Sequence, residues 1–412
     1  MNSVASYRIL GADYTVSNDA RATGLNNNDL IIGQSGSGKT GSYVIPNIQT
    51  LDHSLIVSDT KCNLYRHFKD ELIAKGFKVS ILDFVHPETS CQYNPLRYIR
   101  RYSNGKYREQ DVLSLATSLV PSMDKKEPFW EMAARTYISY LIGYVLETLP
   151  PSEQNLYQVS RMHRLFSLTR GEDQFYKHAS SDPTSFSSRK YLHIKGSMTA
   201  DRTWACISEF ATQALSIYDT NTILHMIGRG ISLDLRSFGS EKHVLFLNVS
   251  DTDRTYDGLI NSFYTQALQV LCSQADSSPD NRLKIPVRII LDDFGTSAKI
   301  QNFDKIISVI RSREIYVSII LQCVTQLDSS YGRSIAKTIF GNCDHIIYLG
   351  GNDYETAEYI ASHAHTSPER VLTLPRGKEY ILETGKQGHL ANRIRPYSTL
   401  KSKESSTDIP AS

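Results

Sequence analysis

Short apolar runs recur near the start of the chain and again after residue 242, with longer mixed stretches between them. Continuous Val, Ile and Leu without apolar–polar alternation is typical of strands that are buried on both faces. The pattern therefore predicts an α/β fold in which helices cover a mainly parallel sheet. The predicted strands are LII (30–32), SLIVS (54–58), KVSILD (78–83), HVLFLNV (243–249), VRIILD (287–292), YVSIILQ (316–322) and HIIYLG (345–350).

The strand-like runs stop between residues 97 and 225, where apolar residues recur at helical spacing instead. Examples are QDVLSLATSLV (110–120) and FWEMAARTYISYLIGYVLETL (129–149), so we expect an inserted all-α domain. Within it, Ser, Asp and Pro at 176–190 predict a loop. The expected bounds are 1–96 and 226–395 for the two parts of the sheet-bearing domain, 97–225 for the all-α domain, and 396–412 for a disordered tail.

The chain has 412 residues, a formal net charge of +2 and six cysteines. This near balance of charge lacks the broad basic field of a dedicated nucleic-acid binder, so any such contact must be local. The cysteines are scattered without a CxxC pair, which favours reduced thiols in a cytosolic compartment over a zinc site.

The N-terminal stretch MNSVASYRILGADYTV lacks the charged leader and apolar core of a secretion signal. The most apolar helix candidate, residues 136–149, is too short to span a bilayer. We therefore expect no transmembrane segment and a cytoplasmic location; if the protein works at a membrane, a separate partner must hold it there.

The stretch GQSGSGKT, from Gly33 to Thr40, matches the phosphate-loop pattern GxxxxGK[ST] and lies between a predicted strand and a predicted helix. Glycines let backbone N–H groups turn toward phosphate oxygens, and the start of the helix adds partial positive charge. Lys39 is expected to reach the β and γ phosphates of ATP, and Thr40 to offer its hydroxyl to Mg²⁺. A Gly/Ser-rich surface turn could match by chance, and Pro46 should end or bend the helix early. The residues expected to bind the nucleotide are Gly33, Ser35, Gly36, Ser37, Gly38, Lys39, Thr40 and Gly41.

A second acidic element, Asp292 and Asp293, follows the apolar run VRIIL. Asp292 would hold Mg²⁺ through its water shell, together with Thr40, and Asp293 would polarise the attacking water. Two acids after a strand can also serve only as a helix cap. The phosphate loop upstream favours the catalytic interpretation.

Two further polar positions flank the predicted strand YVSIIL. Gln322 follows it and could sense the γ-phosphate or orient water, although a polar residue often simply ends a strand. Arg311 and Arg313 precede it, and a guanidinium there could reach a neighbouring subunit's site as an arginine finger, with Arg311 preferred. Surface arginines are common, so a plain surface position is the alternative.

Taken in order, these motifs resemble the VirD4/TraG type of type IV coupling protein, the conjugation ATPase related to the FtsK and HerA pumps. The resemblance covers roughly residues 28–385. It implies a RecA-like P-loop NTPase bearing an all-α domain, which assembles as a homo-hexamer and uses ATP to move single-stranded DNA and its attached relaxase toward a type IV secretion channel. The stretches that carry it are GQSGSGKTGSYVIPNI, SLIVSDTKCNLYRHFKDELIAKGFKVSILDF, YNPLRYI, FWEMAARTYI, IILDDFGTSAKIQNFDKIISVIRSREIYVSIILQ and GNCDHIIYLGGND.

The resemblance adds residues outside the motifs. Asp59 and Lys61 would lie on the loop after the second strand, and the all-α domain would face the incoming cargo. Basic side chains of that domain could contact phosphates, or form only a solvated basic face. They are Lys125, Lys126, Arg161, Arg164, Arg189 and Lys190.

Departures from the family pattern bear on the activity. Family members usually carry membrane helices before the motor, whereas fewer than 35 residues precede the phosphate loop here, which suggests a member recruited by a membrane partner or a truncated chain. DTKCN stands in place of Asp-Pro-Lys-Gly-Glu, and Asp293 in place of Glu. Hydrolysis could then be slow, because misplacing a base by about an ångström can cost about a hundredfold in rate. The leading hypothesis is an ATP-driven DNA motor, and the alternatives are a nucleotide-gated recruitment module or an FtsK/HerA-like pump with another cargo.

Overall fold

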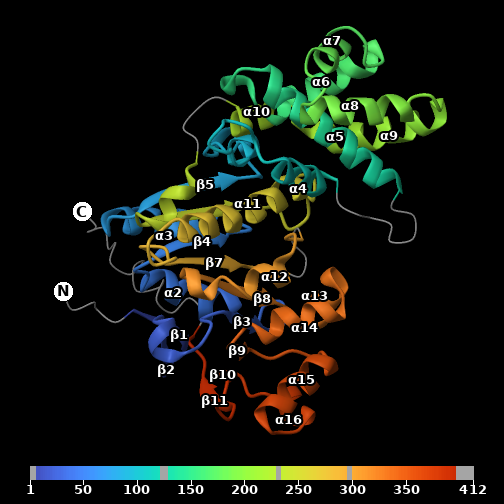
Figure 1. The fold of residues 1–412 in the computed structure, drawn as a ribbon. Helices are drawn as coiled ribbons and strands as arrows, with labels where there is room; N and C mark the ends of the chain where they lie inside the picture. The colour runs from blue at the N-terminus through green and yellow to red at the C-terminus, as the bar shows by residue number, and fades with distance from the viewer. Residues whose placement is uncertain (1–5, 121–128, 229–232, 295–298, 396–412) are drawn as a thin grey trace, which may run out of the picture. The chain divides into compact units, whose positions relative to one another are not determined.

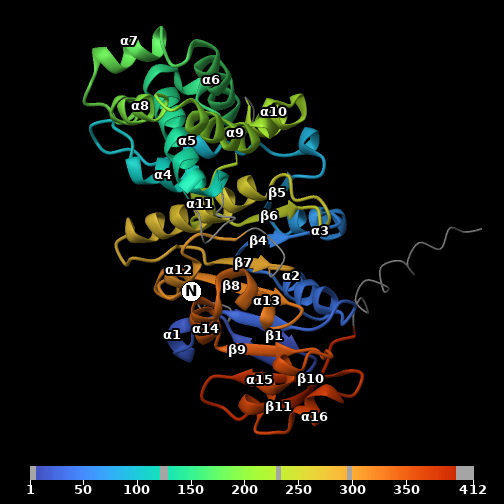
Figure 2. The same ribbon diagram turned by 90° about the vertical axis from the view of Figure 1, so that its right-hand side faces the viewer.

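The computed structural model describes residues 6–120, 129–228, 233–294 and 299–395, and Figures 1 and 2 show it from two sides. The chain divides into two compact units. The predicted tail, 396–412, lies outside the described residues, as do Lys125 and Lys126. The first unit comprises Met1–Ser80, Leu235–Leu247 and Leu271–Ser412, and the second comprises Ile81–Asp234 and Asn248–Val270.

Among the described residues, a nine-stranded sheet has the order β11-β10-β9-β3-β8-β7-β4-β6-β5. From β9 to β6 neighbouring strands pair in parallel, whereas β10 pairs antiparallel with both β9 and β11. The predicted strands are all present, so the predicted α/β fold with a mainly parallel sheet is confirmed. Their bounds are β3 Asp29–Ile32, β4 Ser54–Ser58, β5 Lys78–Asp83, β6 His243–Asn248, β7 Val287–Leu291, β8 Ile315–Leu321 and β9 His345–Tyr348.

Four short strands are not predicted by the sequence pattern. β1 and β2 form an antiparallel hairpin of their own, and β11 is mostly exposed. Strands with one face in water carry mixed side chains and lack a continuous Val/Ile/Leu run, so the apolar pattern does not reveal them. They are β1 Tyr7–Gly11, β2 Tyr14–Ser17, β10 Lys378–Glu383 and β11 His389–Asn392.

Every residue of β3, β4, β7, β8 and β9 is buried, which requires cover on both faces of the sheet. In α3, for example, Leu64, Phe68 and Leu72 recur every four residues and are all buried, so one stripe of the helix packs inward. The helices of the first unit are α1 Ala20–Thr23, α2 Ile45–Gln49, α3 Asn63–Ala74, α12 Phe303–Ile307, α13 Thr325–Tyr331, α14 Arg333–Gly341, α15 Tyr354–Ala364 and α16 Pro368–Leu372. A further helix, α11 Asp257–Asp276, has its first part in the second unit and its last part in the first.

The second unit is built around α5, which packs against α4, α6, α8 and α9 (Figure 1). Its core is aromatic: the Tyr137 ring of α5 lies 5.3 Å from Phe166 and 5.0 Å from Trp204, between ring centroids. The helices of the unit are α4 Glu109–Leu119, α5 Phe129–Thr148, α6 Leu156–Thr169, α7 Gln174–Ser181, α8 Phe186–Ser197, α9 Asp201–Leu215 and α10 Asn221–Ile227.

Within the described ranges of both units, no helix is long and apolar enough to cross a membrane.

The predicted loop at 176–190 is wrong, because α7 and α8 occupy most of it. Only the short segment between them, 182–185, is outside a helix. Ser185 caps α8 by accepting a hydrogen bond from Ser188 N (3.2 Å). The serines therefore mark the start of a helix, which is a common position for this residue type.

Candidate active site

The phosphate loop follows the carboxyl end of β3 and is held between the neighbouring strands β8 and β9. Gly33 N donates to the last carbonyl of β8 (3.1 Å), and Gln34 N donates to a carbonyl just after β9 (3.1 Å). Gly36 and Gly38 have φ angles of +76° and +87°, in the left-handed region that favours glycine. The loop is thus tied to the sheet at its start, and its two turns need the glycines that the sequence provides.

Close packing inside the loop also excludes a side chain at Gly33. An added Cβ would lie 2.5 Å from Ser37 Oγ and 3.0 Å from Leu349 Cβ. The Ser37 hydroxyl is buried and has no hydrogen-bond partner within the described part of the chain. An unpartnered buried hydroxyl inside a tight loop is what a ligand oxygen could satisfy.

Lys39 is buried and folds back across the loop. Its Nζ donates to Gly33 O (2.6 Å) and to Gln34 O (3.3 Å). Burial lowers the pKa of Lys39, and the nearby Asp293 and Asp292 carboxylates oppose that shift. The ammonium group is therefore held at the loop by weak neutral acceptors, which a phosphate could replace.

The helix after the loop begins with a π turn over Thr40–Val44 and continues as α2. Ile45 N donates to Thr40 O across this wide turn, and Pro46 lies in the first turn of α2. The wide turn accommodates a residue that has no N–H to donate. The helical run ends with α2 at Gln49, so the early end predicted from Pro46 is confirmed.

The phosphate loop meets the acidic strand end through one hydrogen bond. Thr40 Oγ1 donates to Asp292 Oδ2 (3.1 Å), and Asp293 N donates to Asp292 Oδ1 (3.0 Å). Burial, together with the neighbouring Asp293 carboxylate, raises the pKa of Asp292 to about 6. The structure therefore brings the pair Lys39 and Thr40 together with the pair Asp292 and Asp293, although Thr40 and Asp292 lie 252 positions apart in the sequence.

Gln322 and Asp293 share this edge of the sheet. Gln322 directly follows β8, the strand next to β3, and its N–H donates to Gln326 Oε1 (2.8 Å). Asp293 has a φ of +49°, an uncommon backbone conformation for an aspartate. Both side chains are half-buried at the carboxyl ends of parallel strands, where α/β proteins usually bind their ligands.

Arg311 lies at the opposite end of the parallel strands, just before the amino-terminal end of β8. It precedes β8, and at about 3.3 Å per residue the seven residues of β8 separate it from the phosphate loop by roughly 20 Å. Its guanidinium donates to Ala20 O (3.4 Å) and lines a cavity of about 580 Å³. The structure does not bring Arg311 to the phosphate loop of its own chain. Three more arginines line the same cavity, Arg21, Arg282 and Arg313.

Asp59 and Lys61 follow β4, as expected. The Asp59 carboxylate accepts hydrogen bonds from Asn63 N (3.0 Å) and Tyr65 N (2.9 Å), so it caps the start of α3. Burial raises the pKa of Asp59, and these backbone bonds oppose that shift. Lys61 is exposed. The capping geometry explains Asp59 without a ligand.

The basic residues singled out in the predicted all-α domain differ in their surroundings. Arg164 pairs with Asp219 (3.2 Å), and Arg189 pairs with Glu109 (2.6 Å). Lys190 lies over the Phe186 ring, with Nζ 5.6 Å from its centroid, and Arg161 is exposed. Two of the four described cations are thus engaged by carboxylates.

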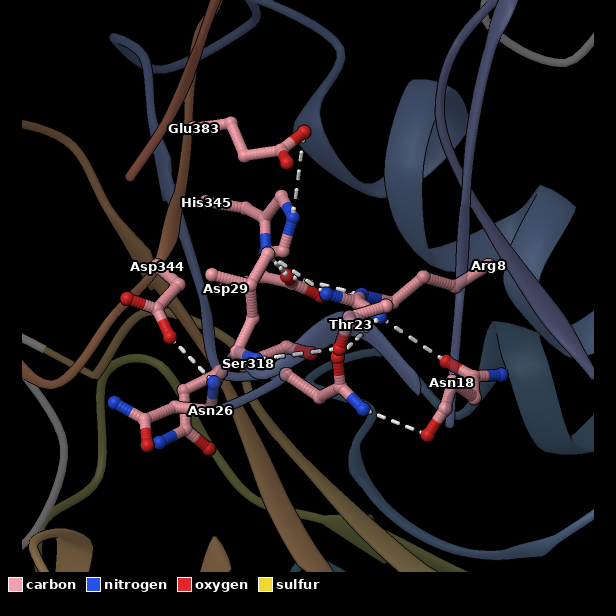
Figure 3. Close-up of polar contacts among 12 residues, drawn as sticks. Arg8, Asn18, Thr23, Asn26, Asp29, Ser318, Asp344, His345 and Glu383 are labelled. Atoms are coloured by element: carbon pink, nitrogen blue, oxygen red, sulfur yellow. Dashed lines mark hydrogen bonds and ion pairs between the residues drawn. The ribbon is translucent and has the colours of Figure 1, made fainter. Parts of the chain in front are cut away.

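A buried ionic network, which sequence reasoning missed, surrounds Asp29 at the start of β3 (Figure 3). Arg8 Nε donates to both carboxylate oxygens (3.0 and 2.9 Å), and Arg288 Nη1 (3.1 Å) and the Tyr43 hydroxyl (2.5 Å) donate to Oδ2. Burial would raise the pKa of Asp29, but the two guanidiniums hold it below its usual value. Tyr43 belongs to the π turn after the phosphate loop, so the network anchors that turn to β1, β3 and β7.

His345 completes the network on β9. Arg8 Nη2 donates to His345 Nδ1 (2.8 Å), which requires an unprotonated nitrogen there, and burial lowers the pKa of His345. The ring is therefore neutral, and its Nε2 lies 3.9 Å from the Glu383 carboxylate of β10 (Figure 3). Single arginines and histidines carry no motif, so only the fold reveals this set.

The residues at the loop fit a magnesium–nucleotide complex. The Thr40 hydroxyl and the Asp292 carboxylate are oxygen donors of the kind that Mg²⁺ prefers, and they already meet at 3.1 Å. The buried Ser37 hydroxyl without a protein partner and the turned glycines leave polar groups for phosphate oxygens. The predicted nucleotide and metal ligands therefore form one continuous set.

Comparison with known proteins identifies a family. A family model described as "Type IV secretory system Conjugative DNA transfer" matches residues 7–365. Among curated proteins, none matches the chain.

Several solved structures share the fold. The unbound bacterial conjugative coupling protein TrwBdeltaN70 is 14% identical, with a TM-score of 0.67 over 94% of this chain and 88% of that one. The plasmid coupling protein TrwB in complex with ADP and Mg²⁺ is 15% identical, with a TM-score of 0.65 over 89% and 85%. VirB4 of Thermoanaerobacter pseudethanolicus is 12% identical, with a TM-score of 0.57 over 97% and 99%. The fold is therefore TrwB-like, which confirms the predicted RecA-like P-loop architecture.

Proposed function

The chain belongs to the family of type IV secretory system conjugative DNA transfer proteins and is a coupling protein of the VirD4/TraG type; we propose that it is an ATPase whose hydrolysis drives the transfer. The observation that carries the proposal is the 3.1 Å hydrogen bond between Thr40 Oγ1 and Asp292 Oδ2. It joins a phosphate loop to an acidic strand end, as a P-loop NTPase requires. TrwB, which shares the fold, was solved with ADP and Mg²⁺.

Each residue of the site has a distinct part in the proposal. The Lys39 ammonium group, which donates to Gly33 O and Gln34 O in this structure, would donate to the β and γ phosphates instead when the nucleotide is bound. Thr40 and Asp292 hold Mg²⁺, which when bound neutralises charge on the phosphates. Asp293 orients the attacking water, and Gln322, directly after β8, senses the γ-phosphate. The glycines and serines from Gly33 to Gly41 provide the phosphate cradle.

The active species in this proposal is a homo-hexamer. Arg311 lies at the end of β8 that points away from its own phosphate loop, so it can act only on a nucleotide bound by a neighbouring copy. There it would stabilise charge on the transferred phosphoryl group. The arginine-lined cavity beside it is compatible with an anionic group supplied by another subunit.

The proposed cargo is single-stranded DNA with its attached relaxase, passed to the type IV secretion channel. The family assignment supports this cargo, and the exposed Arg161 and the partly exposed Lys190 are candidates for phosphate contacts. We propose a cytoplasmic location at the inner face of the cell membrane, where a separate membrane protein provides the anchor.

Nucleotide binding by the full chain tests the site directly. Calorimetric titration with ADP should show Mg²⁺-dependent binding that Lys39→Ala weakens strongly. Asp292→Asn should remove most of the Mg²⁺ dependence, because the remaining Thr40 hydroxyl is a poor metal ligand alone. Binding that is indifferent to both substitutions would place the nucleotide elsewhere and overturn the proposal.

A second candidate function is a nucleotide-gated recruitment module with little hydrolysis. The observation that favours it is Asp293, whose side chain is short and whose φ is +49°. A gate would change relaxase affinity equally with ATP and with a non-hydrolysable analogue, whereas a motor needs continuous turnover. Relaxase binding measured with both nucleotides therefore separates the two candidates.

A further inference from the structure

Arg393, in the segment after β11, contacts the middle of the phosphate loop. Its Nη1 donates to Ser37 O (2.9 Å), between the two left-handed glycines, Gly36 and Gly38. The residue lies 356 positions from Ser37 and beyond residues 7–365, which the family model matches. We propose that Arg393 is a positioning residue that orients the Ser37–Gly38 peptide toward the bound phosphate; this role rests on the proposed function of the loop.

The geometry of a peptide group gives the contact its meaning. The Ser37 carbonyl and the Gly38 N–H belong to one trans peptide, so they point in opposite directions. Fixing the carbonyl against Arg393 outside the loop therefore directs the Gly38 N–H inward. A guanidinium on the carbonyl also polarises the peptide, which makes its N–H a stronger donor to an anion.

Arg393 is itself firmly held. Its backbone N–H donates to Gly377 O (2.8 Å), and its Nη2 donates to Lys378 O (3.0 Å) and to Leu349 O. The guanidinium thus bridges the loop to the end of β9 and the start of β10. The next residue contributes as well, because Ser42 Oγ, in the π turn, donates to Ile394 O (3.1 Å).

The surroundings of Arg393 differ from those of a simple surface ion pair. Glu379 lies in the same buried region, and its pKa is raised to about 8 by burial, with Arg393 opposing that rise. Neither Glu379 Oε1 nor Arg393 Nε has a hydrogen-bond partner in the described part of the chain. The guanidinium is therefore committed to three carbonyls, of which one belongs to the phosphate loop.

The test is titration of the full chain with ADP and with inorganic pyrophosphate. Arg393→Ala should weaken both ligands by about 10- to 100-fold, the value of one charge-assisted hydrogen bond. The affinities for ADP and for pyrophosphate should fall by the same factor, because the lost contact affects only the binding of the phosphates. Guanidinium ion at millimolar concentration should restore part of the affinity of Arg393→Ala, and Arg393→Lys should fall between the two.

Two control variants separate positioning from general stability. Arg376→Gln removes an exposed charge before β10 and should leave both affinities unchanged. Leu382→Ala opens a cavity in β10 and should lower the melting temperature while affinity stays within about threefold of wild type.

The outcomes are distinct. Wild-type affinity in Arg393→Ala, or an equal loss in Leu382→Ala, would overturn the role of Arg393 and leave the proposed function standing. Failure of the wild-type chain to bind either ligand would overturn the proposed function, and the role of Arg393 with it. Phosphate-specific weakening with guanidinium rescue would establish the role.

Discussion

Asp293 sets the expected rate at the scale of a single residue. Its side chain is one methylene shorter than that of Glu, and its φ of +49° is uncommon for a residue other than glycine. Asp293→Glu should therefore raise ATP turnover by about tenfold or more, measured as phosphate release. Asp292→Asn, the matched control, should abolish turnover. A Glu variant no faster than wild type would show that the length of this side chain does not limit the rate.

Glu379 should make stability depend on pH. Burial raises its pKa to about 8 in the folded chain, well above the usual value for glutamate. Between about pH 4.5 and pH 8 the folded chain thus keeps a proton that the unfolded chain releases, so stability falls as pH rises. Urea unfolding should show this slope reduced in Glu379→Gln by up to about 1.4 kcal/mol per pH unit. Equal slopes in both chains would contradict it.

Single residues differ in how far the sequence reveals them. Lys39 and Thr40 lie in one contiguous pattern, and Asp292 ends a buried run, so each carries a local signal. Arg393 carries none, because its partner Ser37 lies 356 positions away and the contact is to a backbone carbonyl. Any residue type offers that carbonyl, so no pattern of side chains could indicate it.

At the scale of elements, the network at Asp29 fastens β1, β3, β7 and the turn after the phosphate loop. Asp29→Asn would leave the buried Arg8 and Arg288 guanidiniums without their carboxylate. We expect a loss of about 3–5 kcal/mol in unfolding free energy, measured by urea titration. Asp70→Asn, on the exposed side of α3, is the control and should change stability little. A loss below about 1 kcal/mol at Asp29 would mean that the network does not hold these elements together.

Elements were predictable where burial imposes a pattern. The parallel strands carry apolar runs because both of their faces are covered, and the sequence predicts each of them. The hairpin of β1 and β2 and the edge strand β11 are partly exposed, so their mixed side chains give no comparable signal. The sequence does not reveal α7 and α8, because serine is common in loops as well as at the start of a helix, where Ser185 caps α8.

At the scale of the whole molecule, one copy of the chain does not complete the proposed site. Arg311→Ala should bind ADP like wild type but lose turnover, because in the proposed hexamer the Arg311 guanidinium acts on a neighbour's nucleotide. Mixing it with Lys39→Ala should restore part of the activity, since one variant supplies the finger and the other the phosphate loop. Phosphate release from the mixture and from each variant alone measures this. Full activity of Arg311→Ala alone, or no recovery on mixing, would contradict a shared site.

The most direct test of the central claim is steady-state ATP turnover by the assembled wild-type chain, with and without single-stranded DNA. Lys39→Ala provides the blank, because it removes the ammonium group that the phosphates need. We expect turnover above this blank, increased by single-stranded DNA. Turnover equal to the blank, or unchanged by DNA in an assembled oligomer, would contradict an ATP-driven DNA motor.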